Sequence, residues 1–135
     1  MFTPVSHRAA HAYNRVAVDS AIAVASPHAL ISMLFTALID SLSRAETAIH
    51  EGNVAAKSKA ISKAVRILDE GLTGSLNTKG GEIAENLAAV YQFGILELIK
   101  ANETNDPEAV TRVLGLITPI ADSWAAIGPE VDNKY

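Results

Sequence analysis

The side chains whose spacing best suits metal chemistry are His7 and His11, which stand four residues apart in the string HRAAH. On a helix this spacing places both imidazoles on one face, as in helical zinc sites. The glutamate of the zinc-protease motif is absent from the string, and no third ligand is evident. A di-iron bundle would need a glutamate three residues before a histidine on paired helices, and no glutamate in the chain has that position. We therefore expect no metal cofactor.

The chain also lacks the usual arrangements for nucleophilic or phosphate chemistry. It has no cysteine, which excludes disulfides and thiol catalysis. Gly80 and Gly81 precede a helical segment, but the spacings of a P-loop and of a dinucleotide-binding loop are missing, so a turn is the better interpretation. Glu82 and Glu85 look like charges at a helix start rather than an acid/base pair. The sequence therefore predicts a protein that is not an enzyme and needs no cofactor.

Composition indicates the class of molecule. A chain of 135 residues fits one domain, and its 49% of hydrophobic residues, few of them aromatic and many of them alanine, suit a compact all-α bundle. The net charge of −4 gives no indication of a basic surface that would bind nucleic acid or an anionic membrane. Residues 20–39 carry no charged side chain and are long enough to span a bilayer, but Ser26 and Pro27 interrupt them and no signal-peptide cleavage site follows. We expect a cytosolic chain without membrane insertion.

Helix-start and helix-stop signals divide the first half of the chain. Ser26 is a good N-cap, Pro27 suits the first helical position, and Gly52 is a typical left-handed stop. A long helix is therefore predicted over residues 26–52. Asn53 can cap a second long helix, which we expect to weaken at its glycines shortly after residue 70.

Two further helices are predicted in the second half. The third covers residues 82–102, where Gly94 is expected to admit a close neighbour. The last helix starts after the N-cap Asp106 and stops at Gly128. Pro119 lies inside this helix and predicts a kink.

These elements predict an all-α fold, an antiparallel bundle of four main helices that fills residues 26–128. Residues 1–25 carry no clear capping signal, and we expect an N-terminal arm that lies on the bundle, with or without a short helix. Residues 129–135 are expected to form a loose C-terminal tail.

The second predicted helix has an uneven charge distribution. It carries Lys57, Lys59, Lys63 and Arg66, four of the chain's 11 basic residues. The simpler interpretation is a basic face turned to solvent. The alternative is a binding site for an acidic partner.

Apolar side chains recur more widely than a four-helix seam requires. Broad apolar stripes lie at residues 30–39, 61–72 and 87–99, whereas a surface helix needs an apolar face of only about 100°. The stripes either bury one another in an alanine-rich core or leave a groove that an amphipathic partner helix completes. A third possibility is self-association, in which they bury against another copy of the chain.

Two long strings carry a family resemblance. SPHALISMLFTALIDSLSRAETAIHEGN resembles the first core helix of the flagellin-specific export chaperones, the FliS family. KAVRILDEGLTGSLNTKGGEIAENLAAVYQFGILELIKANETND is similar to the rest of that family's core. Tyr13 and Val16 resemble the tyrosine-containing segment that precedes the family's Ser-Pro, and Trp124 fits near the end. The resemblance covers about residues 11–127 in order.

The resemblance implies a cytoplasmic chaperone that binds the disordered C-terminal segment of flagellin in apolar surface grooves. It would prevent premature polymerisation and deliver flagellin to the flagellar type III export gate, with the N-terminal arm lying over the groove until the client arrives. The residues that the resemblance suggests for client contact are Tyr13, Val16, Ile31, Leu34, Leu38, Leu68, Leu72, Leu87 and Tyr91. Helical spacing alone leaves open which of them face the client and which face the core.

Overall fold

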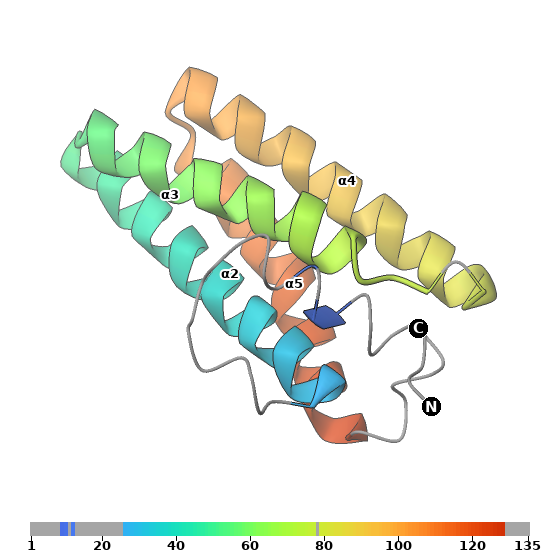
Figure 1. Cartoon of the computed structure of the whole chain (residues 1–135). Helices are drawn as coiled ribbons and strands as arrows, with labels where there is room; N and C mark the ends of the chain where they lie inside the picture. Colours follow the sequence, from blue (N-terminus) through green and yellow to red (C-terminus); the bar gives the residue numbers. More distant parts are fainter. Residues whose placement is uncertain (1–8, 11, 13–25, 78, 129–135) are drawn as a thin grey trace.

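Four antiparallel helices make up most of the computed structural model, which describes residues 9, 10, 12, 26–77 and 79–128. They are α2 (Pro27–Glu51), α3 (Val54–Arg66) with its continuation η2 (Ile67–Thr73), α4 (Gly81–Thr104) and α5 (Pro107–Ile127). Each helix runs opposite to the one before it, and α2 and α3 lie side by side (Figure 1). No strand occurs among the described residues. The predicted all-α bundle of four main helices is confirmed.

The predicted ends of α2 are confirmed in detail. The Ser26 hydroxyl accepts a hydrogen bond from the Ala29 N–H at 3.1 Å, and Pro27 occupies the first helical turn. Gly52 has φ 68°, and its N–H donates to carbonyls of the last helical turn. Because a glycine adopts this left-handed conformation without a Cβ clash, the chain reverses there and α3 begins two residues later.

Local capping also sets the starts of α3 and α5. Asn53 Oδ1 accepts a hydrogen bond from the Ala56 N–H at 3.1 Å, and Asp106 Oδ1 accepts one from the Glu108 N–H at 3.0 Å. Each bond satisfies one of the N–H groups that lack a partner in a helical first turn. α5 continues through Pro119 as one helix, so the proline does not end it.

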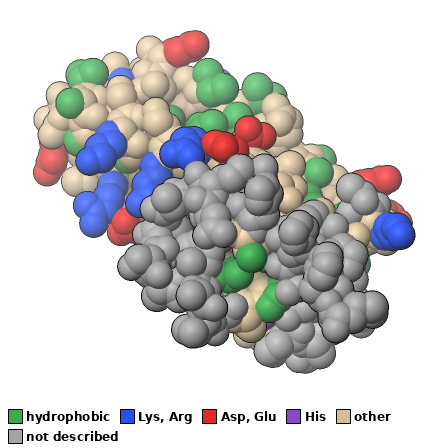
Figure 2. All heavy atoms as spheres, in the orientation of Figure 1, with side chains coloured by type: hydrophobic (Ala, Val, Ile, Leu, Met, Phe, Trp, Pro, Cys, Tyr) green, Lys and Arg blue, Asp and Glu red, His purple; other side chains and the backbone are tan. Residues whose placement is uncertain are grey.

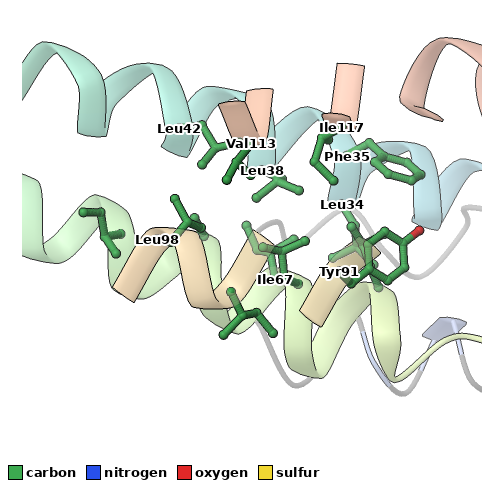
Figure 3. Packing of buried hydrophobic residues seen from close by; sticks show 14 of the residues in the cluster. Leu34, Phe35, Leu38, Leu42, Ile67, Tyr91, Leu98, Val113 and Ile117 are labelled. Atoms are coloured by element: carbon green, nitrogen blue, oxygen red, sulfur yellow. The ribbon is translucent and has the colours of Figure 1, made fainter. Parts of the chain in front are cut away.

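The core is one cluster of apolar side chains from all four helices. Small side chains of α2 and α3, among them Ala45, Ala60 and Ala64, are buried in this cluster. Figure 3 shows larger side chains meeting between the helices. The largest fully buried ones are Leu34, Leu38, Leu42, Ile67, Leu68, Leu72, Leu98, Ile117, Val110 and Val113.

The end of the second helix differs from a regular α-helix. Ile67–Thr73 winds as a π-helix, in which Thr73 Oγ1 donates to the Leu68 carbonyl at 2.7 Å. A Cβ on Gly71 would lie 3.1 Å from Leu34 Cδ2, so this glycine permits η2 to lie close against α2. The wider turn accompanies a tertiary contact that helical spacing does not encode.

One basic residue of α3 lies inside the bundle rather than on its surface. Lys57 is 5% exposed, and its Nζ donates to the Asn102 carbonyl at 2.9 Å and to Asn105 Oδ1 at 2.6 Å. Both acceptors belong to the end of α4, where the last carbonyls have no helical partners and the helix dipole favours a cation. Lys57 therefore caps α4, and the prediction that placed it on a solvated face is wrong.

The predicted N-terminal arm and C-terminal tail lie largely outside the described residues. Of the arm, Ala9, Ala10 and Ala12 are described, and the side chains of Ala9 and Ala12 are fully buried. His7 and His11 are outside the described part, as are residues 129–135. The proposed division into arm, core and tail remains a prediction at both ends.

By length and composition alone, α5 is the one described helix that could cross a membrane. Core helices of soluble proteins pass the same test, so one such helix is weak evidence for a span. α5 contributes the fully buried Val110, Val113 and Ile117 to the core. The uncharged stretch at residues 20–39 overlaps α2, which packs within the bundle.

The Lys57 cap generates the first prediction. Lys57→Ala removes two charge-assisted hydrogen bonds and leaves acceptors at the end of α4 without their donor, so the free energy of unfolding should fall by about 2–3 kcal/mol. Urea unfolding measures this loss. The matched control is Lys59→Ala, whose side chain is exposed on the same helix and should change stability by less than about 0.5 kcal/mol. Equal effects of the two substitutions would contradict the cap.

Candidate functional site

An apolar groove opens between the first part of α2, the first half of α4 and the second half of α5. Its volume is about 370 Å³, and η2 with the turn after it completes the lining. None of the described side chains that line it carries a charge. They are Ile31, Phe35, Leu72, Ser75, Leu76, Ile83, Leu87, Tyr91, Pro119, Ile120, Ser123, Trp124 and Ile127. Such a surface suits an apolar partner, and its described side chains cannot form an ion pair with a small charged substrate.

The groove is still partly open to solvent at its edges. Ile83 on α4 is 49% exposed and Ile127 on α5 is 37% exposed. Leu87, Ile120 and Trp124 are only partly buried against the core. Covering this surface with an apolar partner would be favourable by roughly 25 cal/mol for each Å² of apolar area removed from water.

The structure separates the sequence-predicted residues into two groups. Ile31, Leu72, Leu87 and Tyr91 line the apolar groove. Leu34, Leu38 and Leu68 do not, and their side chains are fully buried in the core cluster. Tyr13 and Val16 lie outside the described residues.

Sequence reasoning had not named the α5 wall of the groove or Ile83 as contact residues. Pro119, Ile120, Trp124 and Ile127 supply that wall. The apolar spacing of the last helix indicated a buried stripe, but spacing does not say which neighbour the stripe faces.

Two side chains from opposite ends of the sequence join the helices beside the groove. His28 Nε2 donates to the Trp124 carbonyl at 2.7 Å, because a carbonyl oxygen only accepts, and Trp124 Nε1–H donates to the His28 carbonyl at 3.1 Å. The two rings stack with centroids 4.9 Å apart and planes 20° apart. This His28–Trp124 clasp fixes the end of α5 against the start of α2 and so holds one wall of the apolar groove.

Tyr91 places a buried hydroxyl in the groove wall. It is 3% exposed, and burial raises the pKa of its phenol well above the ordinary value of 10.0. Its hydroxyl makes no hydrogen bond to any other described residue. A bound partner that offers a polar group there would satisfy it.

The described residues offer little for catalysis. They contain no group of three side chains that could hold a metal ion. Their ion pairs, such as Arg112 Nε to Glu97 Oε1 at 2.8 Å between α5 and α4, lie on the surface and away from the apolar groove.

Comparison with known proteins points in one direction. A family model described as flagellar protein FliS matches residues 9–131. The chain is 46% identical over 120 residues to the flagellar secretion chaperone FliS of Salmonella typhimurium, covering 88% of this chain and 89% of that one. It is 36% identical over 123 residues to the flagellar secretion chaperone FliS of Vibrio cholerae, covering 90% of each. The match to the flagellar secretion chaperone FliS of Bacillus subtilis is 28% over 118 residues and covers 87% of each.

The His28–Trp124 clasp predicts energetic coupling between the two side chains. In a double-mutant cycle with His28→Ala and Trp124→Ala, the coupling energy should be about 0.5–1.5 kcal/mol from ring stacking, since each hydrogen bond ends on a backbone carbonyl that survives the partner's substitution. Urea unfolding of the four proteins gives the value. A control cycle pairs Trp124→Ala with His50→Ala at the other end of α2 and should be additive. Zero coupling in the first cycle would mean that the rings do not stack in solution.

The buried phenol predicts a loss of stability at alkaline pH. The folded state keeps Tyr91 neutral, whereas the unfolded chain ionises it above about pH 10, so the unfolded state binds fewer protons there. The free energy of unfolding should therefore fall as pH rises above 10, by up to about 1.4 kcal/mol per pH unit.

The Tyr91→Phe variant isolates this effect. It should unfold with a shallower pH dependence above pH 10, and near neutral pH it should be about as stable as the unaltered protein because the hydroxyl has no hydrogen-bond partner among the described residues. Tyr135→Phe, at the last position of the chain, is the control and should leave the slope unchanged. Identical slopes for Tyr91→Phe and the unaltered protein would overturn the assignment.

Proposed function

The chain belongs to the family of the flagellar protein FliS, and we propose that it is a cytoplasmic flagellar secretion chaperone whose client is the C-terminal segment of flagellin. In this proposal the segment binds as an amphipathic helix across the apolar groove. The bound segment is kept from premature polymerisation until flagellin reaches the flagellar type III export gate. The protein catalyses no reaction in this role.

The observation that carries the proposal is the apolar lining that the described residues give the groove, with no charged side chain among them. At about 370 Å³ it is too small to enclose a helix but holds several apolar side chains of a helix lying across it. Anchors spaced three and four residues apart on the client would reach Ile83 and Leu87 on one side and Trp124 on the other. The polar face of the client helix would stay in water.

The binding energetics favour a client that is disordered when free. Ordering such a segment costs conformational entropy, which the burial of apolar surface must offset. A groove that already exposes Ile83 and Ile127 provides that surface without unfolding the chaperone. We therefore expect binding with a negative heat-capacity change.

We propose distinct roles for the predicted contact residues. Ile31, Leu72, Leu87 and Tyr91 touch the client, because they line the apolar groove. Leu34, Leu38 and Leu68 do not line the groove and support its wall from the core behind it. Leu72 lines the groove but is only 1% exposed, so it offers the client the least surface of the four. The earlier prediction for Tyr13 and Val16, that they lie over the groove until the client arrives, is retained as part of the proposal.

Self-association is the competing use of exposed apolar surface. Phe93, Leu96 and Ile99 of α4 are 46%, 57% and 45% exposed, and none of them lines the groove. Exposed side chains of this size also suit a contact between two copies of the chain. A molar mass above that of the monomer, unchanged by added flagellin peptide, would favour this alternative.

The test is a matched pair of charge substitutions. Ile83→Asp places a carboxylate in the groove and should weaken binding of a labelled flagellin C-terminal peptide by about tenfold or more, because the client would have to bury a charge. Val54→Asp puts the same change on a side chain that is 64% exposed and lies outside the groove. It should leave the affinity unchanged. Fluorescence anisotropy of the peptide measures both.

Circular dichroism would first establish that the two variants are folded. Equal affinities for the unaltered protein and Ile83→Asp would contradict the proposed site. Absence of peptide binding to the unaltered protein would contradict flagellin as the client.

A further inference from the structure

The four basic residues of α3 differ in their burial and in their hydrogen-bond partners. Lys57 is buried against the end of α4, and Arg66 Nε pairs with Glu70 Oε2 at 3.0 Å. Lys59 and Lys63 are exposed and make no ion pair or hydrogen bond with any other described residue. Since they stand four residues apart, they share one face of the helix. α3 itself contains no acidic residue.

A cleft between α2 and α3 lies beside these two lysines. Figure 2 shows Lys and Arg side chains gathered over α3 and the adjoining part of α2. The cleft has a volume of about 340 Å³, and we refer to it as the α2–α3 cleft. The residues of its lining that matter here are Asp40, Ser41, Arg44, Lys59, Ala60 and Lys63.

The α2–α3 cleft is locally positive in an acidic chain. Arg44 Nε donates to Asp40 Oδ2 at 2.8 Å, and that pair is exposed. Among the described residues, the lining therefore carries three cations and one carboxylate, a surplus of two positive charges, whereas the whole chain has a net charge of −4. Like charges this close repel one another, and an anion in the cleft would relieve the repulsion.

The cleft also contains a buried hydroxyl. Ser41 lines the cleft, is 1% exposed, and makes no hydrogen bond with any other residue in the described part of the chain. A buried hydroxyl without a partner is unfavourable. An oxygen of a bound ligand is the natural acceptor for its proton, and a carboxylate in particular forms a strong, charge-assisted bond.

We propose that the α2–α3 cleft binds the carboxylates of an acidic segment of a partner protein. One carboxylate would accept from Ser41 Oγ and Lys59 Nζ, and a second, one helical turn away, would lie between Lys63 and Arg44. The small side chain of Ala60 gives the segment room to approach the helix backbone. No residue in the described part of the chain lines both this cleft and the apolar groove, so the acidic segment binds while a client occupies the groove.

Short acidic peptides fit this site better than nucleic acid or an anionic membrane. A polyanion gains affinity by contacting many cations along a strip, whereas here three cations surround a single small cleft. Beyond the cleft, the negative net charge of the chain repels a long polyanion. A pair of carboxylates satisfies the local charge without extending past it.

Amide NMR titration tests the proposal with the full chain. The probe is a short peptide in which paired glutamates alternate with alanines, and its glutamine counterpart is the uncharged reference. We expect saturable shifts in the segments around Ser41 and Ala60 with the glutamate peptide only. The apparent affinity should fall several-fold between about 50 and 200 mM salt because the contacts are ionic.

Two sets of variants sharpen the result. The double variant Lys59→Gln/Lys63→Gln should lower the affinity for the glutamate peptide roughly tenfold, and Ser41→Ala should lower that affinity by a smaller factor. The matched control, Lys79→Gln/Lys100→Gln, removes two exposed lysines elsewhere and should leave the titration unchanged. Ile83→Asp should also leave it unchanged, so failure of this site and failure of the groove as client site are distinguishable.

Three outcomes would overturn the proposal. The first is no saturable shift in the cleft, and the second is equal shifts with the glutamine peptide. The third is tighter binding at the cleft by single-stranded DNA or by vesicles of anionic lipid than by the glutamate peptide, which would assign the cleft to a polyanion instead.

Discussion

The structure depends on the close contact between Leu34 of α2 and Gly71 of η2. A Cβ on Gly71 would lie 3.1 Å from Leu34 Cδ2, which is closer than most contacts that Cβ atoms make. The absence of a side chain at Gly71 therefore leaves room for the fully buried side chain of Leu34. At Gly94 of α4 a Cβ would lie 3.4 Å from Leu68 Cδ1. The distance at Gly94 is close to an ordinary van der Waals contact, so Gly71 is the glycine that lets α2 and η2 interlock. Packing this close leaves little freedom for the helices to shift against one another.

The apolar groove follows from where this interlock ends. Ile31 lies one turn before Leu34, and Leu72 lies one turn after Leu68, so both residues are held firmly at the edge of the core. On the other side the His28–Trp124 clasp anchors the end of α5. The groove is thus a preformed surface between closely packed helices. In the proposed complex, only the client would lose conformational entropy on binding. The α2–α3 cleft, with its separate lining, leaves a second surface for another partner.

The sequence predicted helix ends well because their causes are local. Ser26, Gly52, Asn53 and Asp106 each act within one helical turn, and the structure confirms every one of them. The division between core and groove could not be predicted in this way. Ile31 and Leu34 share one apolar stripe, and only the positions of α4, η2 and α5 decide that the first lines the groove while the second is enclosed.

The π-turns of η2 and the burial of Lys57 were missed for the same reason. Lys57 donates to the carbonyl of Asn102 and η2 lies close against Leu34, and both contacts join residues far apart in the sequence.

The most direct test of the central claim is the heat capacity of binding, from calorimetric titrations of the protein with the flagellin C-terminal peptide at several temperatures. A one-to-one complex with a strongly negative heat-capacity change, and a gain of peptide helicity, is the predicted result. No binding, or binding without a heat-capacity change, would contradict coupled folding of a client onto the apolar groove.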